Sequence, residues 1–186
     1  MANILIVSGH TDLKGDSVAN KEILAQLEQR LPDAVIDRLS DLYPDYRIDV
    51  QTEQAKLEAA DVVVLQFPVF WYAMPSLLQK WMEDTFQHGW SHGSTGTALR
   101  GKKLVISLTA GAPVELYAQG EAMGHSIDEF FYCSEATAAL TGMELAGTVF
   151  TGGVSYEMRE DATAMQQMRV AASDHVDRLV SLLSEL

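Results

Sequence analysis

The sequence has little cysteine, little positive charge and no long apolar run. Cys133 is the single cysteine among 186 residues, so no intramolecular disulfide can form. Because it lies in an apolar stretch, and free cysteine is commonly buried, we expect an inert buried thiol. No apolar run approaches the roughly 18 residues of a membrane span, and the segment from Met1 to Ser8 lacks the basic and apolar regions of a secretion signal. We therefore expect a soluble cytoplasmic protein that does not insert into membranes.

Positive charge is scarce, because 13 Lys and Arg stand against 26 Asp and Glu, a net charge of −13. Such a surface repels phosphate backbones, so nucleic acid is excluded as a partner class, and anionic lipid is disfavoured. The hydrophobic fraction of 47% and the charged fraction of 21% are ordinary for a globular protein. The length suits one α/β domain over residues 1–186.

Continuous apolar runs predict buried strands of a parallel sheet covered on both faces. The strong runs are Ile4–Val7, Val62–Leu65 and Leu104–Leu108, and the weaker ones are Ala34–Leu39 and Leu145–Phe150. Helical patterns separate them at Val18–Leu31, Thr52–Ala60, Pro75–Gln87, Ser126–Thr141 and Glu157–Leu186. The alternation predicts an open parallel five-stranded α/β sheet of order 2-1-3-4-5 with helices on both faces. In that topology ligands bind beyond the carboxyl ends of strands 1, 3 and 4, at the loops 8–20, 66–72 and 109–117.

The first loop leaves strand 1 and opens a helix that we expect Ser17 to cap. A helix N-terminus with free N–H groups is a natural site for one phosphate. The alternative is that Ser17 only caps the helix and His10 is a surface turn residue. The loop has neither a GxGxxG nor a Walker A pattern, which argues against a dinucleotide-fold protein or an ATPase.

The second loop, residues 66–75, reads Gln-Phe-Pro-Val-Phe-Trp-Tyr-Ala-Met-Pro and is rich in aromatic side chains and proline. It predicts a rigid apolar platform for a flat π-system, and the alternative is a loop packed on its own aromatics.

The third loop, residues 109–117, begins with small residues that let the backbone approach a ligand, and the alternative is an ordinary small-residue turn.

A long motif surrounds the second loop and consists of Glu53, Gln54, Leu57, Ala60–Pro68, Trp71, Tyr72, Pro75, Leu77, Leu78 and Trp81. By these residues the segment 3–117 resembles the NAD(P)H:quinone oxidoreductase family. One bacterial branch, the ancillary flavoprotein subunits of glutathione-gated potassium efflux systems, is more similar still. That similarity lies in Ser17, Ala19, Asn20, Leu42–Tyr46, Ile48, Asp49, Phe86, His88–Trp90, Gly93, Thr97–Leu99, Gly101 and Lys102.

The resemblance implies a flavodoxin-like fold, a tightly bound FMN or FAD, and a homodimer with the active site between subunits. The short chain favours FMN, with FAD as the alternative. The residues expected at the phosphate end of the flavin are His10, Ser17, Val18, Ala19 and Asn20. Those expected along the isoalloxazine are Val69, Phe70, Trp71, Tyr72, Thr109, Ala110, Gly111, Ala112 and Pro113, with Phe67 and Pro68 in support.

The third loop departs from the family, which usually has Thr-Thr-Gly-Gly after strand 4. Ala110 and Ala112 replace family residues, and Pro113 has no N–H to donate. Tyr117 stands where the family has a charge-stabilising tyrosine, whereas the family histidine is replaced by Met123. His125 either substitutes for that histidine or is a surface residue.

The resemblance implies an NAD(P)H dehydrogenase (quinone)-like enzyme that takes electrons from NADH or NADPH and reduces quinones by two-electron, ping-pong hydride transfer. Tyr117, with Tyr72, is the expected catalytic pair that hydrogen-bonds the acceptor. No metal is expected, because Gly89 and Gly93 disfavour a helix-borne His88–His92 pair. Alternative functions are regulation of a potassium efflux transporter at the inner membrane, one-electron transfer, and reduction of azo or nitro compounds.

Overall fold

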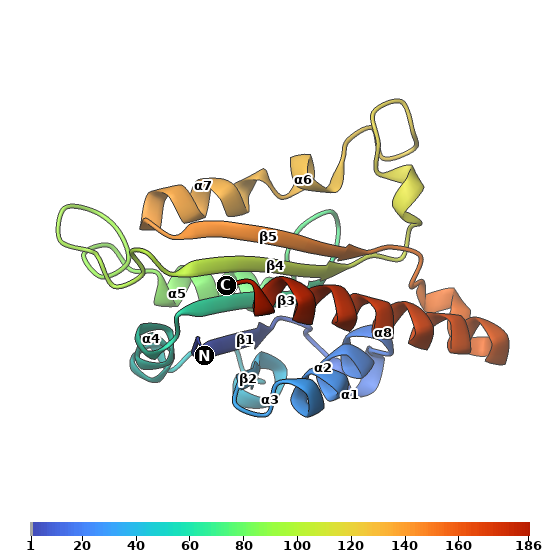
Figure 1. Ribbon diagram of the computed structural model, residues 1–186, viewed down its shortest axis with the longest axis horizontal. Coiled ribbons are helices and arrows are strands. Elements are labelled where there is room, and N and C mark those ends of the chain that lie inside the picture. Colours follow the sequence, from blue (N-terminus) through green and yellow to red (C-terminus); the bar gives the residue numbers. More distant parts are fainter. Residues whose placement is uncertain (1) are drawn as a thin grey trace.

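Five parallel strands form one sheet in the order β2-β1-β3-β4-β5 in the computed structural model, which describes residues 2–186 (Figure 1). The strands are β1 Ile4–Ser8, β2 Val35–Arg38, β3 Val62–Pro68, β4 Lys103–Thr109 and β5 Glu144–Thr151. Each pairing between neighbours is parallel. The predicted α/β class, flavodoxin-like fold and strand order are therefore confirmed.

The central strand β3 is buried along its whole length, as its unbroken apolar run predicts. Val63, Leu65 and Phe67 point into one core layer, whereas Val62 and Val64 point into the other. Because side chains alternate between the faces of a strand, a continuous apolar run requires covering helices on both sides.

The longer helices form one layer on each face of the sheet (Figure 1). Helices α2 Ala19–Arg30 and α8 Ala162–Ser184 pack against the face that carries Val62 and Val64. Helices α4 Val50–Ala59, α5 Ser76–Thr85 and α7 Tyr132–Thr141 pack against the other face. The short helices are α1 Leu13–Asp16, α3 Leu39–Leu42, α6 Ile127–Phe130, η1 Val114–Leu116 and η2 Tyr156–Glu160.

The predicted helix at residues 126–141 is broken at Phe131 into α6 and α7. The ring of Phe131 is buried against Phe67, with 5.4 Å between centroids, so a tertiary contact accompanies the break. The predicted helix from Glu157 begins only at Ala162, because the Asp161 carboxylate accepts from the Ala164 N–H and caps it. The expected burial of Cys133 is wrong, since it lies on the exposed side of α7.

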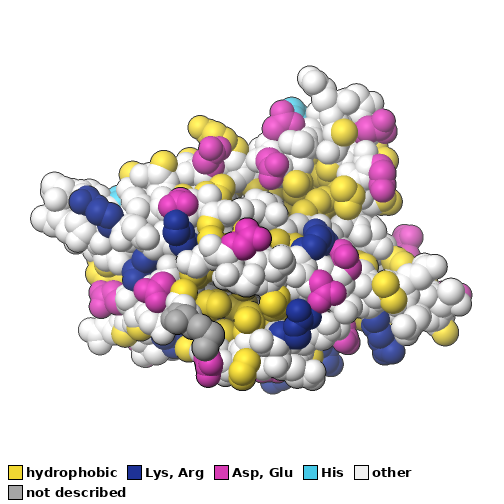
Figure 2. Space-filling view, in the orientation of Figure 1, with side chains coloured by type: hydrophobic (Ala, Val, Ile, Leu, Met, Phe, Trp, Pro, Cys, Tyr) yellow, Lys and Arg dark blue, Asp and Glu magenta, His cyan; other side chains and the backbone are white. Residues whose placement is uncertain are grey.

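Acidic and basic side chains are mixed over the face shown in Figure 2, where no extended basic patch is visible. Within residues 2–186, no helix combines the length and apolar character that crossing a membrane requires.

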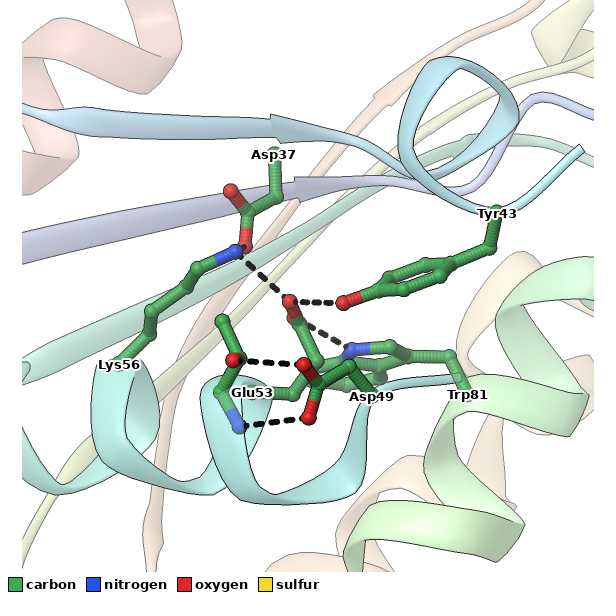
Figure 3. A network of polar contacts seen from close by, with 7 residues as sticks. Asp37, Tyr43, Asp49, Glu53, Lys56 and Trp81 are labelled. Carbon is green, nitrogen blue, oxygen red and sulfur yellow. Dashed lines mark hydrogen bonds and ion pairs between the residues drawn. The ribbon is translucent and has the colours of Figure 1, made fainter. Parts of the chain in front are cut away.

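A buried carboxylate, Glu53, joins the segments on one side of the sheet (Figure 3). Its oxygens accept hydrogen bonds from the Tyr43 hydroxyl at 2.7 Å, Trp81 Nε1 at 2.8 Å and Lys56 Nζ at 2.7 Å. Lys56 Nζ also lies 2.8 Å from Asp37 Oδ2 on β2. Helix α4 is thereby tied to β2, to α5 and to the segment that follows α3.

Burial by itself would raise the pKa of Glu53. The hydrogen bonds from Lys56, Tyr43 and Trp81 outweigh burial and hold the pKa of Glu53 below its ordinary value. Burial prevails at Asp37, where it raises the pKa despite the hydrogen bond from Lys56. Glu53 is therefore ionised at neutral pH, and the donors around it act on a full negative charge.

Replacing Glu53 with Gln should lower the free energy of unfolding by about 2 kcal/mol at neutral pH, because an amide cannot accept from all the donors around it. Since the folded pKa is depressed, the stabilisation by Glu53 is present above the unfolded pKa and is lost as pH falls through the folded value. The difference between wild type and Glu53→Gln in urea denaturation should therefore shrink below pH 4.5.

The matched control is Glu83→Gln, which removes an exposed carboxylate from α5. It should change stability little at any pH. Equal losses in the two variants would show that the Glu53 contacts do not stabilise the fold.

Candidate functional site

A cavity of about 310 Å³ opens at the carboxyl ends of the central strands, where the strand order predicts a ligand site. Predicted residues that line it are His10, Ser17, Val18, Ala19, Asn20, Pro68, Val69, Phe70, Thr109, Ala110 and Gly111. Predicted residues outside the lining are Phe67, Trp71, Tyr72, Ala112, Pro113 and Tyr117. The sheet thus brings the three predicted loops to one cavity.

The N-terminus of α2 forms one end of the cavity. Its N-cap residue is Val18, which makes no side-chain capping bond, so the expected capping position of Ser17 is wrong by one residue. The Ser17 hydroxyl instead accepts from the Lys21 N–H at 3.2 Å. The N–H groups of Ala19 and Asn20, in the first turn, remain for a ligand.

His10 is buried in the cavity wall and is not the surface turn residue of the alternative interpretation. Burial lowers its pKa, although the carboxylates of Asp16 and Asp12 act in the opposite direction. Its Nδ1 accepts from the Asp12 N–H at 3.1 Å, so the neutral ring carries its proton on Nε2 and can donate from there.

Arg159 brings a positive charge into the cavity wall that the sequence reasoning missed. Its Nη1 lies 2.8 Å from Asp16 Oδ1, and its guanidinium lies 4.0 Å from the centre of the Tyr156 ring. The other missed lining residues are Asp16, Val154, Ser155, Tyr156 and Met168. Most follow β5, whose carboxyl end lies at the same sheet edge, so extending the topological argument to strand 5 would have found them.

The aromatic loop ends in a tight turn with an exposed indole. The backbones of Phe70 and Ala73 exchange hydrogen bonds of 3.1 and 3.0 Å. Between them, Trp71 and Tyr72 have positive φ angles of 50° and 63°, a conformation that costs a non-glycine residue roughly 1–2 kcal/mol. Trp71 is 94% exposed, so the alternative of a loop packed on its own aromatics fails for this side chain.

The two predicted catalytic tyrosines meet at Phe130. Tyr72 stacks on Phe130 at 5.6 Å, and Tyr117 meets the same ring edge-on at 6.0 Å. Burial raises the pKa of Tyr117, and Tyr72 raises it further, so the Tyr117 hydroxyl keeps its proton at neutral pH. His125 also meets Phe130 edge-on but is exposed, 3.7 Å from Glu129, which agrees with the surface interpretation.

The backbone of the third loop is partly occupied by β5 and the segment after it. The Ala110 N–H donates to the Thr151 carbonyl at 2.9 Å, and the Ala112 carbonyl accepts from the Gly153 N–H at 2.8 Å. A Cβ at Gly152 would lie 2.6 Å from the Ala112 oxygen, so glycine is needed for this close approach. Gly111 lines the cavity, and its N–H bonds to no other backbone group and so is free to reach a ligand.

Across residues 2–186 there is no group of three or more His, Cys, Asp or Glu side chains that could hold a metal ion. The rings of His88 and His92 lie 5.5 Å apart in the connection between α5 and β4.

A parallel sheet of this order, with a cavity at its switch point, defines the class of the doubly wound α/β proteins. The family model described as a flavodoxin-like fold, Flavodoxin_2, matches residues 2–176, and the chain belongs to this family. The predicted membership of the flavodoxin-like NAD(P)H:quinone oxidoreductases is confirmed, and with it the expected kind of enzyme.

Similar proteins include general stress protein 14 of Bacillus subtilis, 37% identical over 85% of this chain and 89% of that protein. An uncharacterised NAD(P)H oxidoreductase of the same organism, YrkL, is 34% identical over 84% of this chain and 89% of that protein. The ancillary protein KefF of the glutathione-regulated potassium-efflux system of Klebsiella aerogenes is 40% identical over 76% of this chain and 77% of that protein.

Among solved structures, general stress protein 14 of Treponema denticola in complex with FMN has a TM-score of 0.85 and 28% identity, covering 97% of this chain and 99% of that chain. An NADPH-quinone reductase of P. pentosaceus has a TM-score of 0.76 and 25% identity, covering 95% of this chain and 98% of that chain.

Strain at Trp71 predicts a difference between two substitutions. Both Trp71→Gly and Trp71→Ala remove the exposed indole, but only glycine relieves the positive φ angle. The glycine variant should have a free energy of unfolding about 1 kcal/mol higher than the alanine variant. Denaturant unfolding of both variants tests this, and equal stabilities would mean that the turn stores no strain at this residue.

Proposed function

We propose that the protein binds FMN in the cavity and uses NADH or NADPH to reduce quinones by two electrons. The observation that carries the proposal is the cavity itself, which joins the N-terminus of α2 to Phe70 of the aromatic loop at the switch point. The FMN complex of a relative similar over 97% of this chain supports FMN as the ligand, with FAD as the alternative.

The residues of the α2 end fit a phosphate group. The first N–H groups of α2 and the Nε2 proton of His10 are donors, and Arg159 supplies a positive charge beside them. We assign Ser17, Val18, Ala19 and Asn20 with His10 to this end.

The residues of the platform end fit a flat ring system. Val69 and Phe70 form the apolar wall beside Pro68, the third loop supplies the N–H group of Gly111, and Ala112 follows just outside the lining. The Ala110 N–H bonds to β5 and Pro113 has none, so both contact a ligand only through other atoms. Phe67 supports the wall from the core.

When bound, the flavin supplies two-electron transfer between nicotinamide and quinone. Tyr117 and Tyr72 both pack against Phe130, and in this proposal their hydroxyl groups donate hydrogen bonds to the oxygen of the acceptor. Donor and acceptor occupy the same place beside the flavin in turn, and this gives ping-pong kinetics.

The same exposure supports a homodimer. Trp71 is 94% exposed and Tyr72 is 53% exposed beside the cavity, and adjacent exposed aromatic side chains are typical of association surfaces. In the proposed dimer the partner subunit covers this platform and closes the acceptor site.

A second candidate function is regulation of a potassium efflux transporter by binding to it. The 40% identity to KefF supports it, and it would bring the protein to the inner membrane through that partner. Co-purification with such a transporter, and a change in its potassium efflux, would separate this function from soluble quinone reduction. Azo and nitro compounds as acceptors are separable by substrate profiling.

The protein purified with FMN should be yellow and should oxidise NADH or NADPH at a rate that saturates with menadione. Replacing Tyr117 with Phe should lower kcat about tenfold, because a donor to the acceptor oxygen is lost, with FMN content unchanged. A protein that stays colourless after mixing with FMN and with FAD contradicts the proposal.

Arg159→Gln should weaken FMN binding about tenfold, because a charge-assisted contact to phosphate is lost. Binding of riboflavin, which lacks the phosphate, should not change. Titration of flavin fluorescence measures both. Arg169→Gln, on the exposed side of α8, is the matched control. An equal loss for FMN and riboflavin would place Arg159 away from the phosphate.

A further inference from the structure

A continuous run of hydrogen-bonded polar side chains crosses the interior from the cavity to α8. Its members in order are Thr109, Asn20, Gln66, Ser107, His175, Thr151 and Arg178. All except Arg178 are at most 6% exposed. Burying this many polar groups is costly unless each is hydrogen-bonded, so the bonds of the run are needed for the stability of the core.

The half nearest the cavity joins α2 to the two central strands. Asn20 Nδ2 lies 2.9 Å from Thr109 Oγ1, and Gln66 Nε2 lies 2.8 Å from Asn20 Oδ1. Ser107 Oγ lies 2.5 Å from Gln66 Oε1. Asn20 and Thr109 both line the cavity, so this end of the run meets the ligand site directly.

The other half continues through α8 to the surface. Ser107 Oγ lies 2.7 Å from His175 Nε2, and Thr151 Oγ1 lies 2.9 Å from His175 Nδ1. Arg178 Nη2 lies 2.7 Å from Thr151 Oγ1. Arg178 is itself held by the Phe150 carbonyl and by the Asp174 carboxylate, each at 2.9 Å.

Arg178 sets the direction of the hydrogen bonds, because a guanidinium only donates. Thr151 Oγ1 accepts a hydrogen bond from it and donates one to His175 Nδ1, so the neutral ring carries its proton on Nε2 and donates to Ser107. Ser107 then donates to Gln66 Oε1, Gln66 Nε2 donates to Asn20 Oδ1, and Asn20 Nδ2 donates to Thr109 Oγ1. The Thr109 hydroxyl proton is left to point at an acceptor in the cavity.

The reverse arrangement, in which donor and acceptor are exchanged in each hydrogen bond from Thr109 to Thr151, is less favourable. Thr109 would then donate to Asn20, and His175 Nδ1–H would donate to Thr151. Thr151 Oγ1 would accept from both His175 and Arg178, and its proton would have no partner in the run, which is costly inside a core. A neutral His175 suits either direction, and burial lowers its pKa to about 3, with Arg178 lowering it and Asp174 opposing.

We propose that Ser107, His175 and Arg178 are positioning residues that hold the Thr109 hydroxyl as a donor to an acceptor oxygen of the cofactor. The proposal rests on the proposed function, in which FMN occupies the cavity. It gives His175 and Arg178 an indirect role at the ligand site. Both residues lie on α8, which covers the face of the sheet opposite to α5.

The first test needs no cofactor and determines which atoms donate in the hydrogen bonds of the run. Nitrogen NMR of protein labelled at histidine should show His175 at neutral pH with its proton on Nε2. A proton on Nδ1 would overturn the proposal, because Thr109 would then donate to Asn20. Arg178→Met, at a partly exposed position, should shift His175 toward the Nδ1 form and weaken FMN binding.

A double-mutant cycle tests the link to the ligand. Thr109→Val should raise the FMN dissociation constant about tenfold, and Ser107→Ala about threefold. In the Thr109→Val background, Ser107→Ala should cause no further loss, because it acts through that hydroxyl. Additive losses, or no loss in Ser107→Ala, would overturn the proposal and give Ser107 a structural role only.

The matched control is Thr85→Val, which removes a buried hydroxyl that bonds to the Trp81 carbonyl at the far end of α5. It should leave FMN affinity unchanged. Wild-type protein that fails to bind FMN would contradict the proposed function, whereas normal binding with an additive cycle would contradict only the positioning role. If Ser107→Ala does not fold, the cycle is completed with Arg178→Met.

Discussion

The parallel hydrogen-bond ladder around β3 is the constraint on which the site depends. It continues one step past the strands, where Gly9 N–H donates to the Gln66 carbonyl at 2.9 Å and Val69 N–H to the Thr109 carbonyl at 2.7 Å. Ala110 N–H does the same to Thr151 at the next strand. The loops that form the cavity are thus fixed by the same bonds that align the strands, and the position of the site follows from sheet register.

Two buried polar systems complement this ladder and have different purposes. The Glu53 group ties helices and loops together around a full charge and touches no cavity residue. The run from Arg178 to Thr109 is neutral except at its exposed end and reaches the cavity wall. The first system therefore determines how the helices pack, and the second determines which way a hydroxyl at the ligand site points.

The strand order and the cavity loops were predictable because buried parallel strands have continuous apolar sequences and the topology assigns their carboxyl ends. The break at Phe131 was not, since it accompanies packing on Phe67, far away in sequence. Arg159 was missed because its charge enters the site from beyond β5. The positive φ angles of Trp71 and Tyr72 have no local signal, because neither residue is glycine, asparagine or aspartate.

The pairing of Arg159 with Asp16 inside the cavity has a consequence for which anions can enter. An incoming anion does not meet a free guanidinium but competes with a carboxylate that already holds it. A singly charged ligand offers no more charge than the carboxylate it displaces, whereas a phosphate monoester carries nearly twice as much at neutral pH. A phosphate group in the proposed site would therefore compete with Asp16 for Arg159 more effectively than a singly charged group would.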